Sequence, residues 1–226
     1  HPQADALLTQ AWYSDMQCMI VHATRFVSET RLENLAGSGK QLFGVVDWQL
    51  PPDVPFAARV LSDYRHGCEL VCRHLRELGH QHILIIGTEM QIYFLRYPEM
   101  DLSTSLPRTM REIWEAEGGT WQALNSESVA DTRDTLDADN FLRILDEPDA
   151  PTAIVGLRDV EASLAQRILS QQRPDLARNM AIVGYFDTPW SVAGHPPITS
   201  VNLNLEEIAR RTIEVIDDSL AGKLTD

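Results

Sequence analysis

The stretch Gly37-Ser38-Gly39-Lys40 carries the residue types of a phosphate-binding loop. That motif requires another glycine five residues before its second glycine, and a serine or threonine directly after the lysine. Asn34 and Gln41 occupy those two positions, so the sequence disfavours binding of a nucleotide phosphate. We interpret the stretch as a turn between a helix and a strand.

Histidines and cysteines concentrate in one part of the chain, at His74, His80 and His82 and at Cys68 and Cys72. The three histidines fall on a predicted helix, turn and strand, so their side chains need not converge as metal ligands do. The two cysteines are four residues apart on one predicted helix. Two thiols are able to hold a metal, but buried small apolar side chains are favoured here. No metal site is predicted.

Other motifs of catalysis and metal binding are incomplete or absent in this sequence. Asp137-Ala138-Asp139-Asn140 begins like a calcium loop, but Pro148 stands where that loop needs a glutamate. The sequence contains no Gly-x-Ser-x-Gly elbow, and spacing alone pairs no two carboxylates as acid and base. The sequence therefore predicts no catalytic residue and no cofactor.

Short apolar runs alternate with amphipathic helical patterns along the chain. Continuous apolar strands separated by helices are typical of parallel sheets covered on both faces, and their number predicts two sheets in two lobes. Strands are expected near 18–21, 42–47, 57–61, 82–86, 152–155, 180–185 and Val201. Helices are expected near 28–37, 67–78, 107–117, 137–146, 160–171 and 205–221, whereas 88–104 shows no clear periodicity.

Ligands of such folds bind outside the carboxyl ends of the strands. The residues that follow the predicted strands are therefore candidates for a binding site. They are His22, Trp48, Asp63 to His66, Thr88, Leu157 to Asp159, Phe186 and Asp187.

One long block, DYRHGCELVCRHLRELGHQHILIIG at 63–87, resembles the effector-binding domain of lac-repressor-type (LacI/GalR) transcriptional regulators. The family pattern there is Asp-Asn-x-x-Gly, then a helix ending in His-Leu-x-x-Leu-Gly-His, then an isoleucine-rich strand ending in glycine. The residues that match this pattern are Asp63, Gly67, His74, Leu75, Leu78, Gly79, His80, Ile83 and Gly87.

Two further blocks follow in the family's order. PTAIVGLRDVEASLAQRIL at 151–169 resembles the family's Pro-Thr-Ala-Ile strand, its Asn-Asp pair and the helix that follows. MAIVGYFDTPWSVAGHPPITSV at 180–201 resembles Val-Val-Gly-Tyr/Phe-Asp-Asp-Thr, followed by Pro-Pro-Leu-Thr-Thr-Val. The helix predicted after 204 fits as well, so the resemblance covers nearly the whole chain.

The resemblance implies an α/β fold of two Rossmann-like lobes with parallel sheets, of the periplasmic-binding-protein-like (type I) class. The expected N-terminal lobe comprises 1–87 plus 200–226, and the expected C-terminal lobe comprises 88–199. Compared with the family, the sequence lacks the helix-turn-helix headpiece, the first strand and helix of the sensor domain, and the last strands. The chain is thus expected to be truncated at both ends, with an incomplete N-terminal lobe.

The family binds its effector in the cleft between the lobes, and this sequence departs from the family pattern there. Arg158 replaces the Asn of the Asn-Asp pair, and Phe186 replaces the first Asp after Gly-Tyr. His66 stands at a position that is often acidic, while Asp187 is retained. Arginine with histidine suits an anionic or aromatic effector; alternatively, Arg158 pairs with an acidic neighbour. The predicted effector-binding residues are His66, Arg158, Asp187, Phe186, Trp48, Asp63 and Tyr64.

The charge balance bears on possible partners. The chain has 226 residues, of which 33 are acidic and 19 basic, for a formal net charge of −14. This charge repels nucleic acid, so DNA contact is expected only through a headpiece that is absent from this sequence. No apolar run is long enough to cross a membrane, and the first residues lack the pattern of a signal peptide. Three cysteines suit a reducing compartment, and a cytoplasmic location is expected.

The sequence thus predicts the effector-sensing and dimerisation domain of a LacI-type transcriptional regulator. It would bind a small molecule, either an anion or a sugar derivative, and form a homodimer. The first alternative is a solute-binding protein of the same fold that serves transport. An α/β enzyme is the least favoured function, because no nucleophile or acid–base pair stands out at the strand ends.

Overall fold

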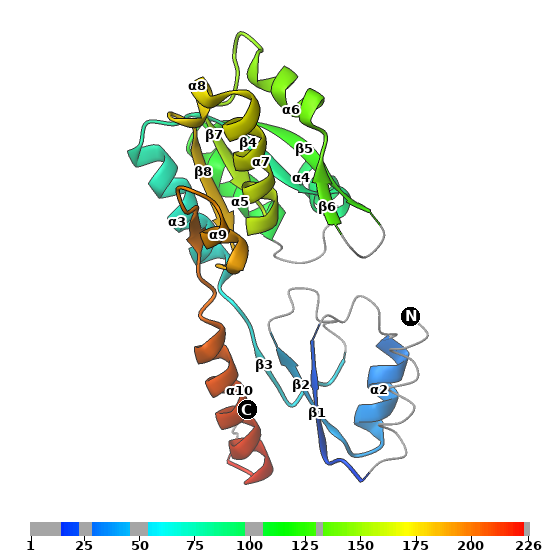
Figure 1. Cartoon of the computed structure of the whole chain (residues 1–226). Helices are drawn as coiled ribbons and strands as arrows, with labels where there is room; N and C mark the ends of the chain where they lie inside the picture. Colours follow the sequence, from blue (N-terminus) through cyan, green and yellow to red (C-terminus); the bar gives the residue numbers. More distant parts are fainter. Residues whose placement is uncertain (1–14, 23–28, 46–53, 98–105, 130–132, 224–226) are drawn as a thin grey trace. The chain divides into compact units, whose positions relative to one another are not determined.

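The computed structural model describes residues 15–22, 29–45, 54–97, 106–129 and 133–223 (Figure 1). The chain divides into two compact units, as the predicted two lobes require. Unit 1 comprises 1–62 with 204–226, and unit 2 comprises 63–203. Trp48, one of the predicted binding residues, lies outside the described residues.

Among the described residues of unit 1 are three parallel strands that are adjacent in chain order: β1 (Cys18–Val21), β2 (Gln41–Val45) and β3 (Ala58–Val60). Helix α2 (Glu29–Gly37) contacts β2, and helix α10 (Leu205–Leu220) contacts β2 and β3. The last helix therefore returns to the unit of the first strands, as the N-terminal lobe expected from the family resemblance requires.

The glycine-rich stretch at 37–40 is the turn between α2 and β2, which confirms the interpretation of these residues. The amide of Ser38 donates to the carbonyl of Asn34 at 3.0 Å, and Gly39 adopts a φ of 84° that favours glycine. The end of a helix presents carbonyl oxygens and partial negative charge, the opposite of what a phosphate requires. The structure thus gives a physical reason against a phosphate loop here.

The described part of unit 2 forms a six-stranded sheet in the order β6-β5-β4-β7-β8-β9. Its neighbouring strands are parallel, except that β6 runs antiparallel to β5. Strand β4 hydrogen-bonds to β5 on one side and to β7 on the other, so it is central in the sheet. The bounds are β4 (His82–Thr88), β5 (Thr120–Val129), β6 (Arg133–Leu136), β7 (Ala153–Gly156), β8 (Ala181–Tyr185) and β9 (Thr199–Val201).

Helices cover this sheet. They are α3 (Tyr64–Glu77), α4 (Glu89–Arg96), α5 (Leu106–Ala116), α6 (Ala138–Leu145), α7 (Asp159–Gln172), α8 (Pro174–Ala177) and α9 (Pro189–Ala193). Leu84 and Ile86 of β4 belong to one apolar cluster with residues of α6 and α7. Ile83 and Ile85 are equally buried and point to the other face, because successive side chains of a strand alternate. The continuous apolar run of β4 is thus buried on both faces, and the predicted α/β class with parallel sheets is confirmed.

The sequence prediction omits α4, β5 and β6 of unit 2, and also the short helices α8 and α9. Strand β5 reads TWQALNSESV, in which polar residues interrupt the apolar ones, so no apolar run marks it as a strand. Helix α4 begins with a capping box: the amide of Gln91 donates to Thr88 Oγ1, and the amide of Thr88 donates to Gln91 Oε1 at 2.9 Å. This Thr-x-x-Gln pair is a start signal that the sequence does contain.

The boundaries between the units differ from those predicted for the lobes. The prediction assigns 63–87 and 200–203 to the N-terminal lobe, whereas both segments belong to unit 2. Segment 63–87 belongs there because its strand β4 is central in the six-stranded sheet and its helix α3 packs against α5. Residues 200 and 201 belong there because β9 pairs with β8.

The two cysteines of α3 are buried, as the sequence analysis favours. Cys68 Sγ lies 3.8 Å from the carbonyl oxygen of Leu106, and Cys72 Sγ lies 3.7 Å from Met110 Sδ, both on α5. Burial raises the pKa of Cys68 far above its ordinary value and that of Cys72 to about 12. Both thiols are therefore neutral at physiological pH and serve as packing groups between the two helices.

Arg76 of α3 contacts α5, and its substitution tests the packing of the two helices. Its guanidinium lies 4.1 Å from the ring centre of the fully buried Trp114 and donates to the carbonyls of Trp114 (3.3 Å) and Glu117 (3.1 Å). We expect Arg76→Ala to lower the free energy of unfolding by about 2 kcal/mol, from the lost cation–π contact and hydrogen bonds. Urea denaturation measures this. The exposed Arg143→Ala is the control and changes stability by less than about 0.5 kcal/mol.

Candidate functional site

The predicted effector-binding residues other than Trp48 lie at one edge of unit 2, the carboxyl edge of its sheet, whereas the candidate His22 follows β1 in unit 1. Arg158 follows β7, and Phe186 and Asp187 follow the neighbouring β8. The start of α3 lies against the same edge: the hydroxyl of Tyr185, at the end of β8, donates to the carbonyl of Tyr64 at 3.4 Å, and the two rings stack with centres 6.3 Å apart. Residues from three separate parts of the sequence thus come together.

At the start of α3, Asp63 acts as the helix cap. Its Oδ1 accepts a hydrogen bond from the amide of His66 at 2.9 Å, which satisfies a donor that the first turn leaves open. The His66 ring is largely exposed, and its Nδ1 lies 4.0 Å from Glu69 Oε2. Gly67 is required by close packing, because a Cβ there would lie 1.9 Å from the Tyr185 hydroxyl oxygen. Asp63 therefore has a structural role, and His66 projects into solvent.

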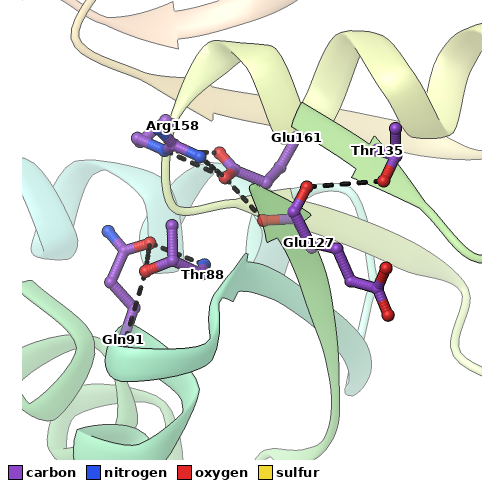
Figure 2. Close-up of polar contacts among 7 residues, drawn as sticks. Thr88, Gln91, Glu127, Thr135, Arg158 and Glu161 are labelled. Atoms are coloured by element: carbon purple, nitrogen blue, oxygen red, sulfur yellow. Dashed lines mark hydrogen bonds and ion pairs between the residues drawn. The ribbon is translucent and has the colours of Figure 1, made fainter. Parts of the chain in front are cut away.

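Arg158 forms an ion pair with Glu161, three residues further on in α7, and Figure 2 shows the two side chains pointing toward each other. The Nε of Arg158 donates to both carboxylate oxygens, at 2.9 and 3.2 Å, and Nη2 also donates to Oε1. Glu161 is fully buried, and Ser126 Oγ on β5 donates to its Oε1 at 3.0 Å. The alternative considered in the sequence analysis, that Arg158 pairs with an acidic neighbour, is the arrangement observed.

Burial raises the pKa of Glu161, while Arg158 and Ser126 lower it and so limit the rise. The desolvation of the carboxylate is the larger effect. A carboxylate at this depth is stable in its charged form only while the guanidinium stays paired with it. The positive charge of Arg158 is thus already balanced inside the protein.

The corner after β8 has an unusual backbone. Phe186 has a φ of 95° and Asp187 a φ of 50°, both in the left-handed region that non-glycine residues rarely adopt. The Asp187 carboxylate accepts from Ser191 Oγ at 3.1 Å and from Asn202 Nδ2 at 2.7 Å. The partly exposed Phe186 ring packs edge-on against Tyr185. The corner therefore holds an exposed carboxylate and an aromatic ring next to one another at the end of β8.

Several polar groups at this edge are absent from the predicted set, among them Ser126, Glu161 and Asn202. Glu161 follows Arg158 by three residues on a helix, which is a spacing at which side chains meet, so the sequence does contain a signal for the pair. Ser126 and Asn202 reach the edge only through strand pairing, which single-sequence patterns do not give. Thr88, at the end of β4, and Gln91, in the first turn of α4, are also part of this edge (Figure 2).

In the part of the chain that the structure describes, no group of three His, Cys, Asp or Glu side chains is placed to hold a metal ion. The histidines noted in the sequence lie on different elements, and His80 Nδ1 lies 2.9 Å from Thr152 Oγ1. No helix among these described residues is long and apolar enough to cross a membrane.

A mainly parallel sheet with polar groups gathered at its carboxyl edge defines a ligand-binding α/β domain. Residues 72–226 match the family model of the periplasmic binding protein-like domain. This chain belongs to that family, and the match confirms the fold class predicted from the resemblance.

Transcriptional regulators are prominent among the similar proteins. The HTH-type transcriptional repressor PurR of Aliivibrio fischeri strain ES114 is 23% identical over 184 residues, which are 79% of this chain and 50% of the relative. The chain spans about half the length of the curated relatives it matches. These relatives bear out the identification of an effector-binding domain of a LacI-family regulator.

Solved structures share the fold at low sequence identity. A LacI family transcriptional regulator from Bifidobacterium animalis subsp. lactis matches with a TM-score of 0.75 at 20% identity, covering 99% of this chain and 77% of that chain. A LacI family regulator from Arthrobacter sp. FB24, in complex with lactose, matches with a TM-score of 0.73 at 17% identity, covering 98% and 74%. At such identities these structures establish the fold alone.

The Arg158–Glu161 pair generates a prediction with a defined pH dependence. Because the pKa of Glu161 is raised in the folded state, the folded protein favours the protonated acid, and stability from this group falls as pH rises through the raised pKa. Arg158→Ala removes the guanidinium, whose hydrogen bonds and charge contribute most to lowering this pKa. We expect a loss of about 3–5 kcal/mol in the free energy of unfolding at pH 8. The loss should be smaller at pH 5, where a protonated Glu161 needs no cation.

Urea denaturation at both pH values measures the loss. Glu161→Gln in the Arg158→Ala background is the control, because it removes the buried charge and should remove the pH dependence of the loss. A loss of the same size at pH 5 and pH 8 in Arg158→Ala would contradict the assignment.

Proposed function

We propose that this chain is the effector-sensing domain of a LacI-type transcriptional regulator, and that it binds a small molecule at the carboxyl edge of unit 2. The observation that carries the proposal is the gathering of Arg158, Phe186 and Asp187 from neighbouring strands at the edge where this fold binds ligands. Effector binding would shift a conformational equilibrium that a homodimer relays to a DNA-binding headpiece. Similarity to repressors rather than to transport proteins supports this function over that of a solute-binding protein.

The charge balance at this edge favours an uncharged effector. The sequence analysis predicts an anionic effector on the assumption that no group of the protein balances the charge of Arg158. In the structure, Glu161 balances this charge. Asp187 adds an exposed carboxylate that accepts hydrogen bonds, and the adjacent Phe186 ring offers an apolar surface. Carboxylates accept hydrogen bonds from hydroxyl groups, and a sugar ring has an apolar face. A neutral sugar therefore fits this edge better than an anion does, and the lactose bound by the Arthrobacter regulator supports the same class.

Matched pairs of ligands test the charge of the effector. Isothermal titration calorimetry compares lactose with lactobionate, ribose with ribose 5-phosphate, and glucose with glucose 6-phosphate. We expect at least one neutral sugar to bind and its anionic partner to bind at least about tenfold more weakly, the change that 1.4 kcal/mol of repulsion produces. Tighter binding of the anions, lost in Arg158→Ala, would establish the anionic effector instead.

Asp187 tests where the sugar binds. Asp187→Asn should weaken binding of the best neutral sugar by about 1.5–3 kcal/mol, the range for hydrogen bonds to a charged group. Glu147→Gln is the matched control. This partly buried carboxylate follows the C-terminal end of α6, where it pairs with Arg143, so the substitution should not alter the affinity for the sugar. An unchanged affinity in Asp187→Asn would place the sugar away from the corner after β8.

The acidic chain should not bind DNA by itself. With a net charge of −14 it repels the phosphate backbone, so fluorescence anisotropy with a labelled duplex should show no affinity that falls between 50 and 200 mM salt, the range over which phosphate contacts weaken. Nanomolar, salt-sensitive binding by these 226 residues would contradict the sensor-domain proposal.

A further inference from the structure

Asp159 is a buried carboxylate that the proposed effector contacts do not use. It is the first residue of α7, it directly follows Arg158, and its side chain is fully buried. Its Oδ2 accepts from the amide of Thr188 at 2.6 Å and from Thr188 Oγ1 at 2.9 Å, and its Oδ1 accepts from Ser200 Oγ at 2.5 Å. These partners are neutral donors. A buried charge held by neutral groups is costly, so its presence calls for a structural reason.

The main chain of β8 leaves room for this carboxylate. A Cβ at Gly184 would lie 2.3 Å from Asp159 Oδ1, which is closer than such atoms approach, and 3.2 Å from the Asp159 Cα, which is a tight contact. Gly184 is part of β8 and pairs with Ser200 of β9. A glycine inside a strand weakens it and marks a close approach of another group. The glycine and the carboxylate thus form one arrangement, in which the start of α7 is pressed against the end of β8.

The donors to Asp159 come from the corner that carries the exposed ligand-facing groups. Thr188 directly follows Asp187, and Ser200 Oγ also accepts from the amide of Asp187 at 3.0 Å. The hydrogen bond from the Thr188 amide to Asp159 and the one from the Asp187 amide to Ser200 therefore hold the backbone at the left-handed residues Phe186 and Asp187. Left-handed backbone at two successive non-glycine residues is unfavourable and persists only where the surroundings fix it.

We propose that Asp159 is a positioning residue: it fixes the Phe186–Asp187 corner after β8 relative to Arg158 after β7, and so sets the spacing of the ligand-facing groups. Asp159 links the two sides of the site, because its backbone directly follows Arg158 and its side chain accepts hydrogen bonds from Thr188 and Ser200. Its significance for the effector rests on the proposed function, but the positioning itself does not.

Hydrogen exchange tests the positioning without any ligand. In Asp159→Ala, the amides of Thr188 and of the corner at 186–191 should exchange at least about tenfold faster, as measured by NMR. Asp159→Asn should restore most of the protection, because its amide oxygen can still accept from Thr188 and its amide nitrogen can donate to Ser200 Oγ. Arg76→Ala, which loosens the contact between α3 and α5, controls for a general loss of stability. Unchanged exchange at the corner in Asp159→Ala, or equal acceleration in Arg76→Ala, would overturn the proposal.

A second pair of variants covers the case in which Asp159→Ala does not fold. Thr188→Ser keeps the hydroxyl and amide that donate to Asp159, whereas Thr188→Val removes the hydroxyl at nearly the same volume. Exchange at 186–191 should rise at least about threefold in Thr188→Val and stay unchanged in Thr188→Ser. Equal exchange in the two variants would overturn the proposal.

Titration with lactose separates the positioning from the effector site. If wild type binds lactose, Asp159→Ala should weaken binding at least about tenfold and Asp159→Asn by less, whereas an unchanged affinity would overturn the role in spacing the ligand-facing groups. If none of the sugars or anions above binds wild type, the proposed function fails. In that case the hydrogen-exchange rates at 186–191 still test whether Asp159 positions the corner after β8.

Discussion

The parallel strands of unit 2 share one carboxyl edge, and the arrangement of polar groups depends on that constraint. Strand β4 sets it, because it is hydrogen-bonded on both sides and buried on both faces. Each neighbouring parallel strand delivers the residues that follow it to the same edge. Tyr64 and Tyr185 are 121 positions apart in the chain and stack there. The polar groups thus come together because the pairing of the strands places the residues that follow them at one edge.

Charge at this edge is balanced in pairs and networks rather than left open. Glu161 is buried where it cannot reach water, and Arg158 compensates for that loss. The exchange of Asn for Arg158 relative to the family pattern therefore does not leave the edge with an added positive charge. Asp159 and Asp187 instead receive hydrogen bonds from Ser, Thr, Asn and backbone donors. Such donors have directions, so they fix geometry more strictly than a point charge does.

The sequence predicts what local patterns determine and misses what strand pairing determines. The apolar run 82–86 identifies β4, and the family blocks identify the residues of the edge. The polar strand β5 carries no such pattern, since its position beside β4 rather than its composition makes it a strand. The boundary placed at residue 87 is wrong for the same reason: only the pairing of β4 with β5 and β7 shows which unit it joins. The role of Glu161 needs its burial, which spacing alone does not give.

The contact between Gly184 and Asp159 also limits how this corner can evolve. Any side chain at position 184 would collide with the carboxylate, and loss of the carboxylate would leave Thr188 and Ser200 without their acceptor. A substitution of the glycine therefore depends on which residue occupies position 159, so the two positions are epistatic. In a descendant of this protein that replaces the glycine, the side chain at position 159 must move or change, and the hydrogen bonds that hold the corner after β8 change with it.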